Sequence, residues 1–277
     1  MDARRPPLRI TDVLAWVADE DLDAFTLDDL VERFEAPRKT AHELGARLVR
    51  GNYAYRLKNG IYVPLPANHW KRPGTPVLAN WHLVAKHVAA PDPYFLAYYT
   101  AMDLHRMIQH PIRTVFIATT GQKADVDADP VAFRFVRIDV ARFAFGHEPM
   151  HVAPGKAAEV ADLERTFLDA VDRLDLCGGI EEVARGFARR HHDLDRERLL
   201  RYVVEFDAPV VTKRLGFLLE IVGHGDARLL RELERLAPRL KRYTLLVPGG
   251  GAVVERSKRW ELAVNADPER LMDAVTT

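Results

Sequence analysis

The stretch LDDLVERFEAPRKTAHELGARLVRGNYAYRLKNGIYV, residues 27–63, decides how the front of this chain folds. Apolar residues recur there every three or four positions up to Leu48, which predicts two helices on either side of Pro37. Strand-forming residues follow, with Asn59-Gly60 as a two-residue hairpin turn. Gly51 is expected to end the second helix in a left-handed conformation.

A further helix is expected before this stretch, because four apolar residues share one helical face there: Ile10, Val13, Leu14 and Val17. Thr26 and Asp29 have the spacing of a capping box, which places a helix start at residue 27. The two helices around Pro37 then form a helix-turn-helix. Three helices followed by a hairpin are typical of a winged helix-turn-helix domain.

Charge changes sign within this region. Residues 1–37 contain ten acids and four bases, a net −6, whereas residues 38–72 contain one acid and eight bases, a net +7. The whole chain of 277 residues is formally neutral, so any affinity for nucleic acid must come from this basic block. A compact basic block on a small domain is the electrostatic pattern of a nucleic-acid binder.

The second helix of a helix-turn-helix enters the major groove with its first residues nearest the bases. We therefore expect Arg38, Lys39 and Thr40 to approach base edges. His42 is a further candidate on the flank of the same helix. Phosphate contacts are expected from the later cations of the helix and from the hairpin, namely Arg47, Arg50, Arg56 and Lys58. A basic helix can also be only a solvated face, but the agreement of several local signals favours DNA binding.

Proline and glycine between residues 64 and 76 indicate a linker. The sequence thus predicts a winged helix-turn-helix domain at residues 1–72 and a larger C-terminal mixed α/β domain at residues 73–277. In the second domain we expect one sheet, with strands at 114–119 and 133–138 and a terminal pair at 243–247 and 260–264 joined by a glycine turn. A helix is expected at 95–107, and Trp70 of the linker is expected to dock on one of the domains.

Several short motifs of the second domain are also informative together. They lie at residues 98–105, 115–119, 162–169, 178–179, 213–216 and 259–265, with Gln109 and Pro111, and the hairpin end at 59–63 belongs with them. In this order they make the chain similar to the AbiEi antitoxins of bacterial abortive-infection toxin–antitoxin systems. The resemblance covers nearly the whole chain.

The resemblance implies a transcriptional repressor that binds double-stranded DNA at the operator of its own operon. It also implies that the C-terminal α/β domain is an antitoxin domain, countering a nucleotidyltransferase-like toxin by direct or indirect action. The expected protein is not an enzyme and needs no cofactor. A nucleic-acid-processing enzyme with a winged-helix delivery domain, or a ligand-sensing regulator, remains an alternative.

Residues able to do chemistry are few. One cysteine, Cys177, cannot form a thiolate zinc cluster, and His191-His192 has no third ligand, so no metal site and no catalytic residue are expected. For the acidic cluster we favour a helix cap and an ion pair between Asp162 and Arg165 over a nuclease-like site that includes Glu164 and Asp169. Lys213 and Arg214 are a candidate toxin- or nucleic-acid-facing patch, with a solvated helix face as the simpler interpretation.

The ends and the apolar runs of the chain bear on its location. The two arginines near Met1 are not followed by an apolar run, so residues 1–7 do not resemble a signal peptide. The apolar stretch 215–222 is too short to span a bilayer. We therefore expect a cytoplasmic protein that makes no membrane contact.

Overall fold

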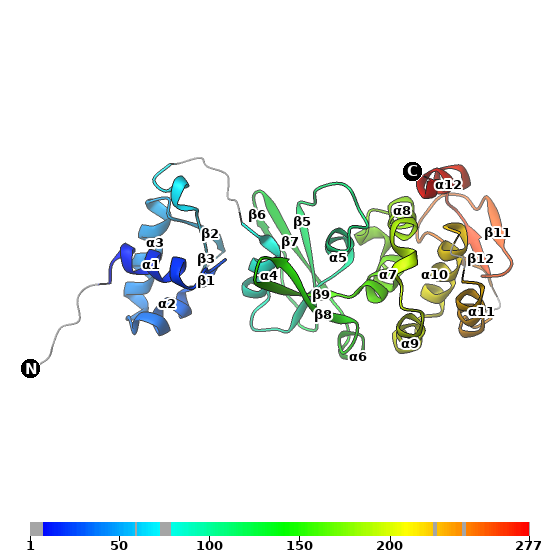
Figure 1. The fold of residues 1–277 in the computed structure, drawn as a ribbon, viewed down its shortest axis with the longest axis horizontal. Coiled ribbons are helices and arrows are strands. Elements are labelled where there is room, and N and C mark those ends of the chain that lie inside the picture. The colour runs from blue at the N-terminus through cyan, green and yellow to red at the C-terminus, as the bar shows by residue number, and fades with distance from the viewer. Residues whose placement is uncertain (1–7, 59, 73–78, 224–225, 240–241, 277) are drawn as a thin grey trace, which may run out of the picture.

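The computed structural model describes residues 8–58, 60–72, 79–223, 226–239 and 242–276 (Figure 1). We refer to residues 8–72 as the front unit and to residues 79–276 as the rear unit. The front unit lies at one end of the molecule, a six-stranded sheet lies in the middle, and a smaller sheet lies at the opposite end.

The front unit contains the three predicted helices and the predicted hairpin in the predicted order. Its elements are α1 (Ile10–Asp19), β1 (Phe25–Thr26), α2 (Leu27–Phe34), α3 (Arg38–Arg50), β2 (Ala54–Lys58) and β3 (Ile61–Pro64). The short strand β1 was not expected, and it pairs with β3 to give the sheet order β1-β3-β2. The capping box is confirmed, since the Thr26 hydroxyl accepts from the Asp29 amide at 3.1 Å and the Asp29 carboxylate accepts from the Thr26 amide at 2.6 Å.

The end of α3 differs from the expectation. Gly51 has a φ of −81°, and the left-handed residue is Asn52, with a φ of +54°. Asparagine tolerates this conformation better than most residues, and its side chain donates to the carbonyls of His69 at 3.1 Å and Arg72 at 2.6 Å. The end of the front unit is thereby tied to α3. Asn59, half of the expected hairpin turn, lies outside the described residues.

Trp70 was expected to dock on one of the two domains, and it docks on the front unit. Its indole Nε1 donates to the Leu65 carbonyl at 2.7 Å, and its ring packs edge-on against Tyr53 with centroids 5.6 Å apart. Residues 65–72 therefore belong structurally to the front unit.

The main sheet of the rear unit confirms the expected mixed α/β class. Its strands are β4 (Tyr94–Leu96), β5 (Thr114–Thr119), β6 (Val126–Ala128), β7 (Val131–Arg137), β8 (His147–Ala153) and β9 (Lys156–Ala161). They are ordered β6-β7-β5-β4-β9-β8, with β4 parallel to β9, β5 parallel to β7, and the other pairs antiparallel. The expected helix at 95–107 is wrong at its start, because Phe95 and Leu96 are fully buried in the central strand β4 and the helix begins only at Tyr98.

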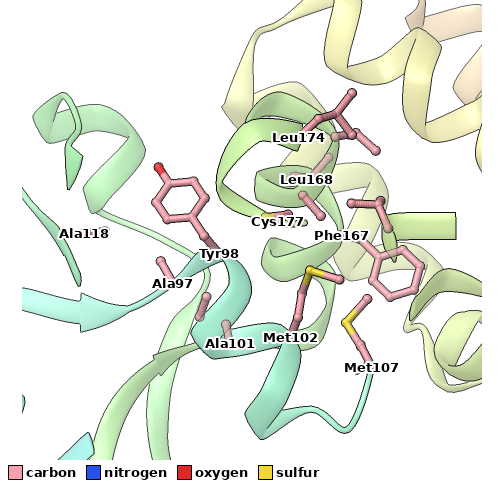
Figure 2. Close-up of a cluster of buried hydrophobic side chains, with 14 of the residues drawn as sticks. Ala97, Tyr98, Ala101, Met102, Met107, Ala118, Phe167, Leu168, Leu174 and Cys177 are labelled. Atoms are coloured by element: carbon pink, nitrogen blue, oxygen red, sulfur yellow. The ribbon is translucent and has the colours of Figure 1, made fainter. Parts of the chain in front are cut away.

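Helices pack around this sheet and extend away from the front unit (Figure 1). They are α4 (Trp81–Ala89), α5 (Tyr98–Leu104), α6 (Val140–Phe143), α7 (Leu163–Asp172), α8 (Ile180–Arg190), α9 (Arg196–Phe206), α10 (Pro209–Ile221), α11 (Ala227–Leu236) and α12 (Pro268–Thr276). Figure 2 shows Met102 and Met107 directed at α7, where Phe167 lies, and all three are fully buried. This contact joins the sheet layer to the helical end of the rear unit.

The expectation of a single sheet is wrong. The strands β10 (Thr244–Leu245), β11 (Glu255–Ser257) and β12 (Leu262–Val264) form a second sheet of the rear unit, ordered β10-β12-β11. The two expected strands run parallel, with β11 paired antiparallel to β12, so Gly249-Gly250-Gly251 does not close a hairpin. Parallel neighbours need a crossover rather than a turn.

The front and rear units share a hydrophobic contact. Leu57, Ile61 and Val63 of the hairpin are buried within the same apolar cluster as the rear core, whereas Ala54 and Tyr62 pack with the helices of the front unit. On the rear unit, the ammonium of Lys156 pairs with Asp23 at 2.8 Å and with Asp21 at 2.9 Å. The hairpin is therefore packed on both of its faces.

Candidate nucleic-acid interface

One side of α3 is buried and the other carries cations. Ala41, Leu44, Gly45 and Leu48 face the core of the front unit. A Cβ at Gly45 would overlap the Tyr62 ring, so the helix sits directly against β3. The opposite side leaves Lys39, Arg47 and Arg50 exposed, as the sequence predicts, and Thr40 is half-buried.

The first turn of α3 and the hairpin form one cleft, which we call the basic cleft. It has a volume of about 730 Å³ and brings together four of the predicted contact residues, Arg38, His42, Arg56 and Lys58. Asp28 and Asp29 of α2 line it as well, and Ala90 and Pro91, which follow α4, form its wall on the rear unit together with His87. Four predicted residues from two elements thus converge.

Charges in the basic cleft are partly compensated. Arg38 forms an ion pair with Asp28. Partial burial and the nearby ammonium of Lys123 lower the pKa of Lys58, and burial, with Lys86 nearby, lowers the pKa of His87. An anion placed near Lys58 would favour its charged form.

The remaining predicted cations lie farther along the helix. Arg47 and Arg50 belong to the last turn of α3, roughly 14–18 Å along the axis from its first residue at 1.5 Å per residue. They are not part of the basic cleft, and neither is Lys39, which is exposed in the first turn of α3. The predicted contacts therefore form a band along α3 and not a single cluster.

Lys213 and Arg214 contradict the predicted surface patch. Taken as whole residues, they are only 1% and 6% exposed. The Lys213 ammonium pairs with Glu261 at 2.7 Å, and the Arg214 guanidinium donates to the carbonyls of Val171 and Leu245 at 3.0 and 3.2 Å. Both predictions, a solvated helix face and a patch that faces a partner, are wrong, because α10 is buried on nearly all sides.

The acidic cluster of α7 is occupied by structural contacts. Asp162 caps the helix through the Arg165 amide at 2.8 Å and accepts from the Tyr202 hydroxyl at 2.7 Å. Glu164 accepts from the Asp195 amide at 2.7 Å. The expected cap is confirmed, but the expected ion pair is wrong, because the Arg165 guanidinium pairs with Asp169 at 2.8 Å.

The surroundings of Arg165 explain this choice. Its guanidinium carbon lies 4.9 Å from the ring centroid of Phe145 and 5.4 Å from those of Phe95 and Phe206. An arginine held among aromatic rings needs a buried carboxylate, and Asp169, one turn farther along α7, provides it. The cluster therefore joins helices, and in the described ranges no group of three histidine, cysteine or acidic residues is arranged to hold a metal ion.

Cys177 is also structural. It is fully buried, and burial raises the pKa of its thiol well above the usual value, which keeps it protonated and unreactive. None of the helices in the part of the chain that the structure describes combines the length and apolar character needed to span a bilayer.

Sequence reasoning missed the rear wall of the basic cleft. His87 and Pro91 come from α4 and its end, about thirty residues after the hairpin, and Lys123 lies farther still. The contact follows from the burial of Leu57 and Ile61 against the rear unit. No local pattern predicts it, although an apolar residue between two cations in β2 was a signal that one face of the hairpin is covered.

Comparison with known proteins supports the fold of the whole chain. No protein-family model and no curated protein matches the sequence. A crystal structure of the RV2827C protein from Mycobacterium tuberculosis matches with a TM-score of 0.68 and 16% sequence identity, covering 99% of this chain and 97% of that chain. The similarity extends over both units, and at this identity it shows a shared fold only.

Proposed function

We propose that this protein is a DNA-binding transcriptional repressor whose front unit acts as a winged helix-turn-helix. The observation that carries the proposal is the position of α3, which leaves its cations exposed next to two further cations of the hairpin. In this proposal, Lys39 and Arg38 of the first turn of α3 would contact base edges, because a recognition helix approaches the bases with its first residues. Arg47, Arg50, Arg56 and Lys58 would hold phosphates.

The antitoxin part of the proposal depends on the resemblance to the AbiEi family. In this role the protein represses its own operon in the cytoplasm, and the rear unit counters a nucleotidyltransferase-like toxin, directly or indirectly. Co-expression with the product of the adjacent gene tests this part, because growth should be rescued by the full chain. Lack of rescue from a toxic neighbour would contradict the antitoxin role and leave the DNA-binding role untouched.

DNA binding is tested by fluorescence anisotropy with the DNA upstream of the gene and a scrambled duplex, over a series of salt concentrations. Arg56→Ala and Lys58→Ala should each weaken binding to both duplexes and reduce the salt slope by about one unit per lost phosphate contact. Lys258→Ala is the matched control, since Lys258 is exposed and follows β11 at the opposite end of the molecule (Figure 1).

Sequence specificity needs a different variant. Lys39→Ala should reduce affinity for the upstream DNA more than for the scrambled duplex, because a base contact carries discrimination and a phosphate contact does not. A parent protein that binds the two duplexes equally, or an unchanged salt slope in both hairpin variants, would contradict the proposal.

A further inference from the structure

A second cleft, walled mainly by apolar side chains, opens at the start of α4 on the rear unit. It has a volume of about 690 Å³, and its lining includes Trp81, Leu104, Ile112, Val115 and Val152. Small organic ligands occupy clefts of about 300–1,000 Å³ with this kind of lining. We call it the apolar cleft.

Asp103 is the one charged residue among those that line the apolar cleft in the described ranges. It is half-buried near the end of α5, and burial raises the pKa of its carboxyl group. Within the part of the chain that the structure describes, its carboxylate accepts no hydrogen bond and forms no ion pair. A carboxylate withdrawn from water without a partner is unfavourable, so a cation brought into the cleft would stabilise it.

His82 is the second titratable group of the apolar cleft. Burial lowers the pKa of its imidazole, which is therefore neutral at neutral pH and offers one donor and one acceptor nitrogen. Asn80 is already engaged, since its amide donates to the Val152 carbonyl at 3.0 Å and its oxygen accepts from the His82 amide at 3.1 Å. The lining thus supplies one negative charge, no competing positive charge and one neutral hydrogen-bonding ring.

We propose that the apolar cleft binds a small organic amine, with its ammonium group on Asp103 and its apolar body against Trp81. An anionic ligand would be repelled by the carboxylate. A neutral apolar ligand would bury the carboxylate further without pairing it. An amine with a hydrocarbon or aromatic body can pack against the apolar wall and pair with the carboxylate of Asp103.

Helix α4 connects this site to the basic cleft. Trp81 and His82 at its start line the apolar cleft, whereas His87 near its end lines the basic cleft together with Pro91. Nine helical residues place the two ends about 13 Å apart. An amine that binds one position of α4 better than another would shift the end of this helix, which forms the wall of the basic cleft beside Arg56 and Lys58. An effect of the amine on DNA binding rests on the proposed DNA-binding function.

Isothermal titration calorimetry on the full chain tests the site without DNA. Phenethylamine, tryptamine and cyclohexylamine are the probes, and 2-phenylethanol is the neutral counterpart of the first. We expect at least one amine to bind, and Asp103→Asn to weaken it at least about ten-fold, as the loss of a charge-assisted hydrogen bond implies. Glu205→Gln, which removes an exposed acid from α9, should leave the affinity unchanged.

Three results would overturn the site: no binding of any of the three amines, equal binding of phenethylamine and 2-phenylethanol, or equal binding by the parent and Asp103→Asn. The anisotropy assay with upstream DNA is then repeated with and without the bound amine. A change in DNA affinity in the parent but not in Asp103→Asn supports coupling through α4, and no change refutes the coupling. If no form binds DNA, the proposed function fails and the calorimetric result on the amine site stands.

Discussion

Replacing Lys213 by methionine tests whether Lys213 is a buried residue that stabilises the fold or a residue of the surface. The Lys213 ammonium lies 2.7 Å from the Glu261 carboxylate, and the exposed fractions of the two side chains are 2% and 20%. Removing one partner of a fully buried ion pair costs about 3–5 kcal/mol. Glu261 retains some contact with water and interacts with more than Lys213, so we expect a smaller loss of about 2 kcal/mol in the free energy of unfolding of Lys213→Met.

Urea denaturation followed by circular dichroism measures this loss. Lys258→Met is the matched control, since an exposed lysine outside such networks changes stability by no more than about 0.5 kcal/mol. The double variant Lys213→Met/Glu261→Gln should recover part of the loss, because the carboxylate that lost its ammonium partner is replaced there by a neutral amide. Equal stability of Lys213→Met and Lys258→Met would refute the reasoning and restore Lys213 as a surface residue.

Two further substitutions test the packing of the core, and a third tests the titration of Asp103. Gly216→Ala should cost roughly 1–3 kcal/mol in a urea titration, because its Cβ would overlap the Trp260 ring. Leu57→Ala should cost about 2–5 kcal/mol in the same assay by opening a cavity between the hairpin and the rear unit. Asp103→Asn should stabilise the protein at pH 7, and the gain should vanish below about pH 3. Burial raises the pKa of the Asp103 carboxyl in the folded state. The native parent protein therefore binds more protons than the unfolded state, and it loses stability as pH rises. Urea titrations at both pH values measure this, and an equal gain at both would contradict it.

Elements with local signals could be predicted from the sequence, and those that depend on distant partners could not. The capping box at Thr26 and the break at Pro37 are short-range features: α2 starts directly after Thr26 and ends before Pro37, and α3 starts directly after Pro37. Residues 95 and 96 belong to a short apolar run that fits a buried helix as well as a buried strand. Only the pairing of β4 with β5 and β9 decides between the two, and those strands follow roughly twenty and sixty residues later.

The candidate site shows the same division. The exposure of Lys39 and Arg50 follows from helical spacing, because the buried stripe of α3 fixes which side faces outward. Lys213 is a lysine like Lys39, but it is buried where Lys39 is exposed. Its ion pair could not be predicted locally, because its partner Glu261 is 48 residues away along the chain. The apolar residues from Leu215 to Leu219 around it were the available signal, because a helix that is apolar on all sides is normally buried.

The hairpin gives the rear unit a direct influence on the proposed DNA contact. In β2, Leu57 is buried against the rear unit, whereas its neighbours Arg56 and Lys58 are exposed in the basic cleft. Leu57 lies where the pairing of β2 with β3 shifts register, between Arg56 opposite Tyr62 and Lys58 opposite Ile61. Both cations therefore flank a residue that is packed in the rear core. Helix α4 packs against β3 of the hairpin. If the proposed DNA contact holds, a change in this packing would alter the position of the two charges relative to α3.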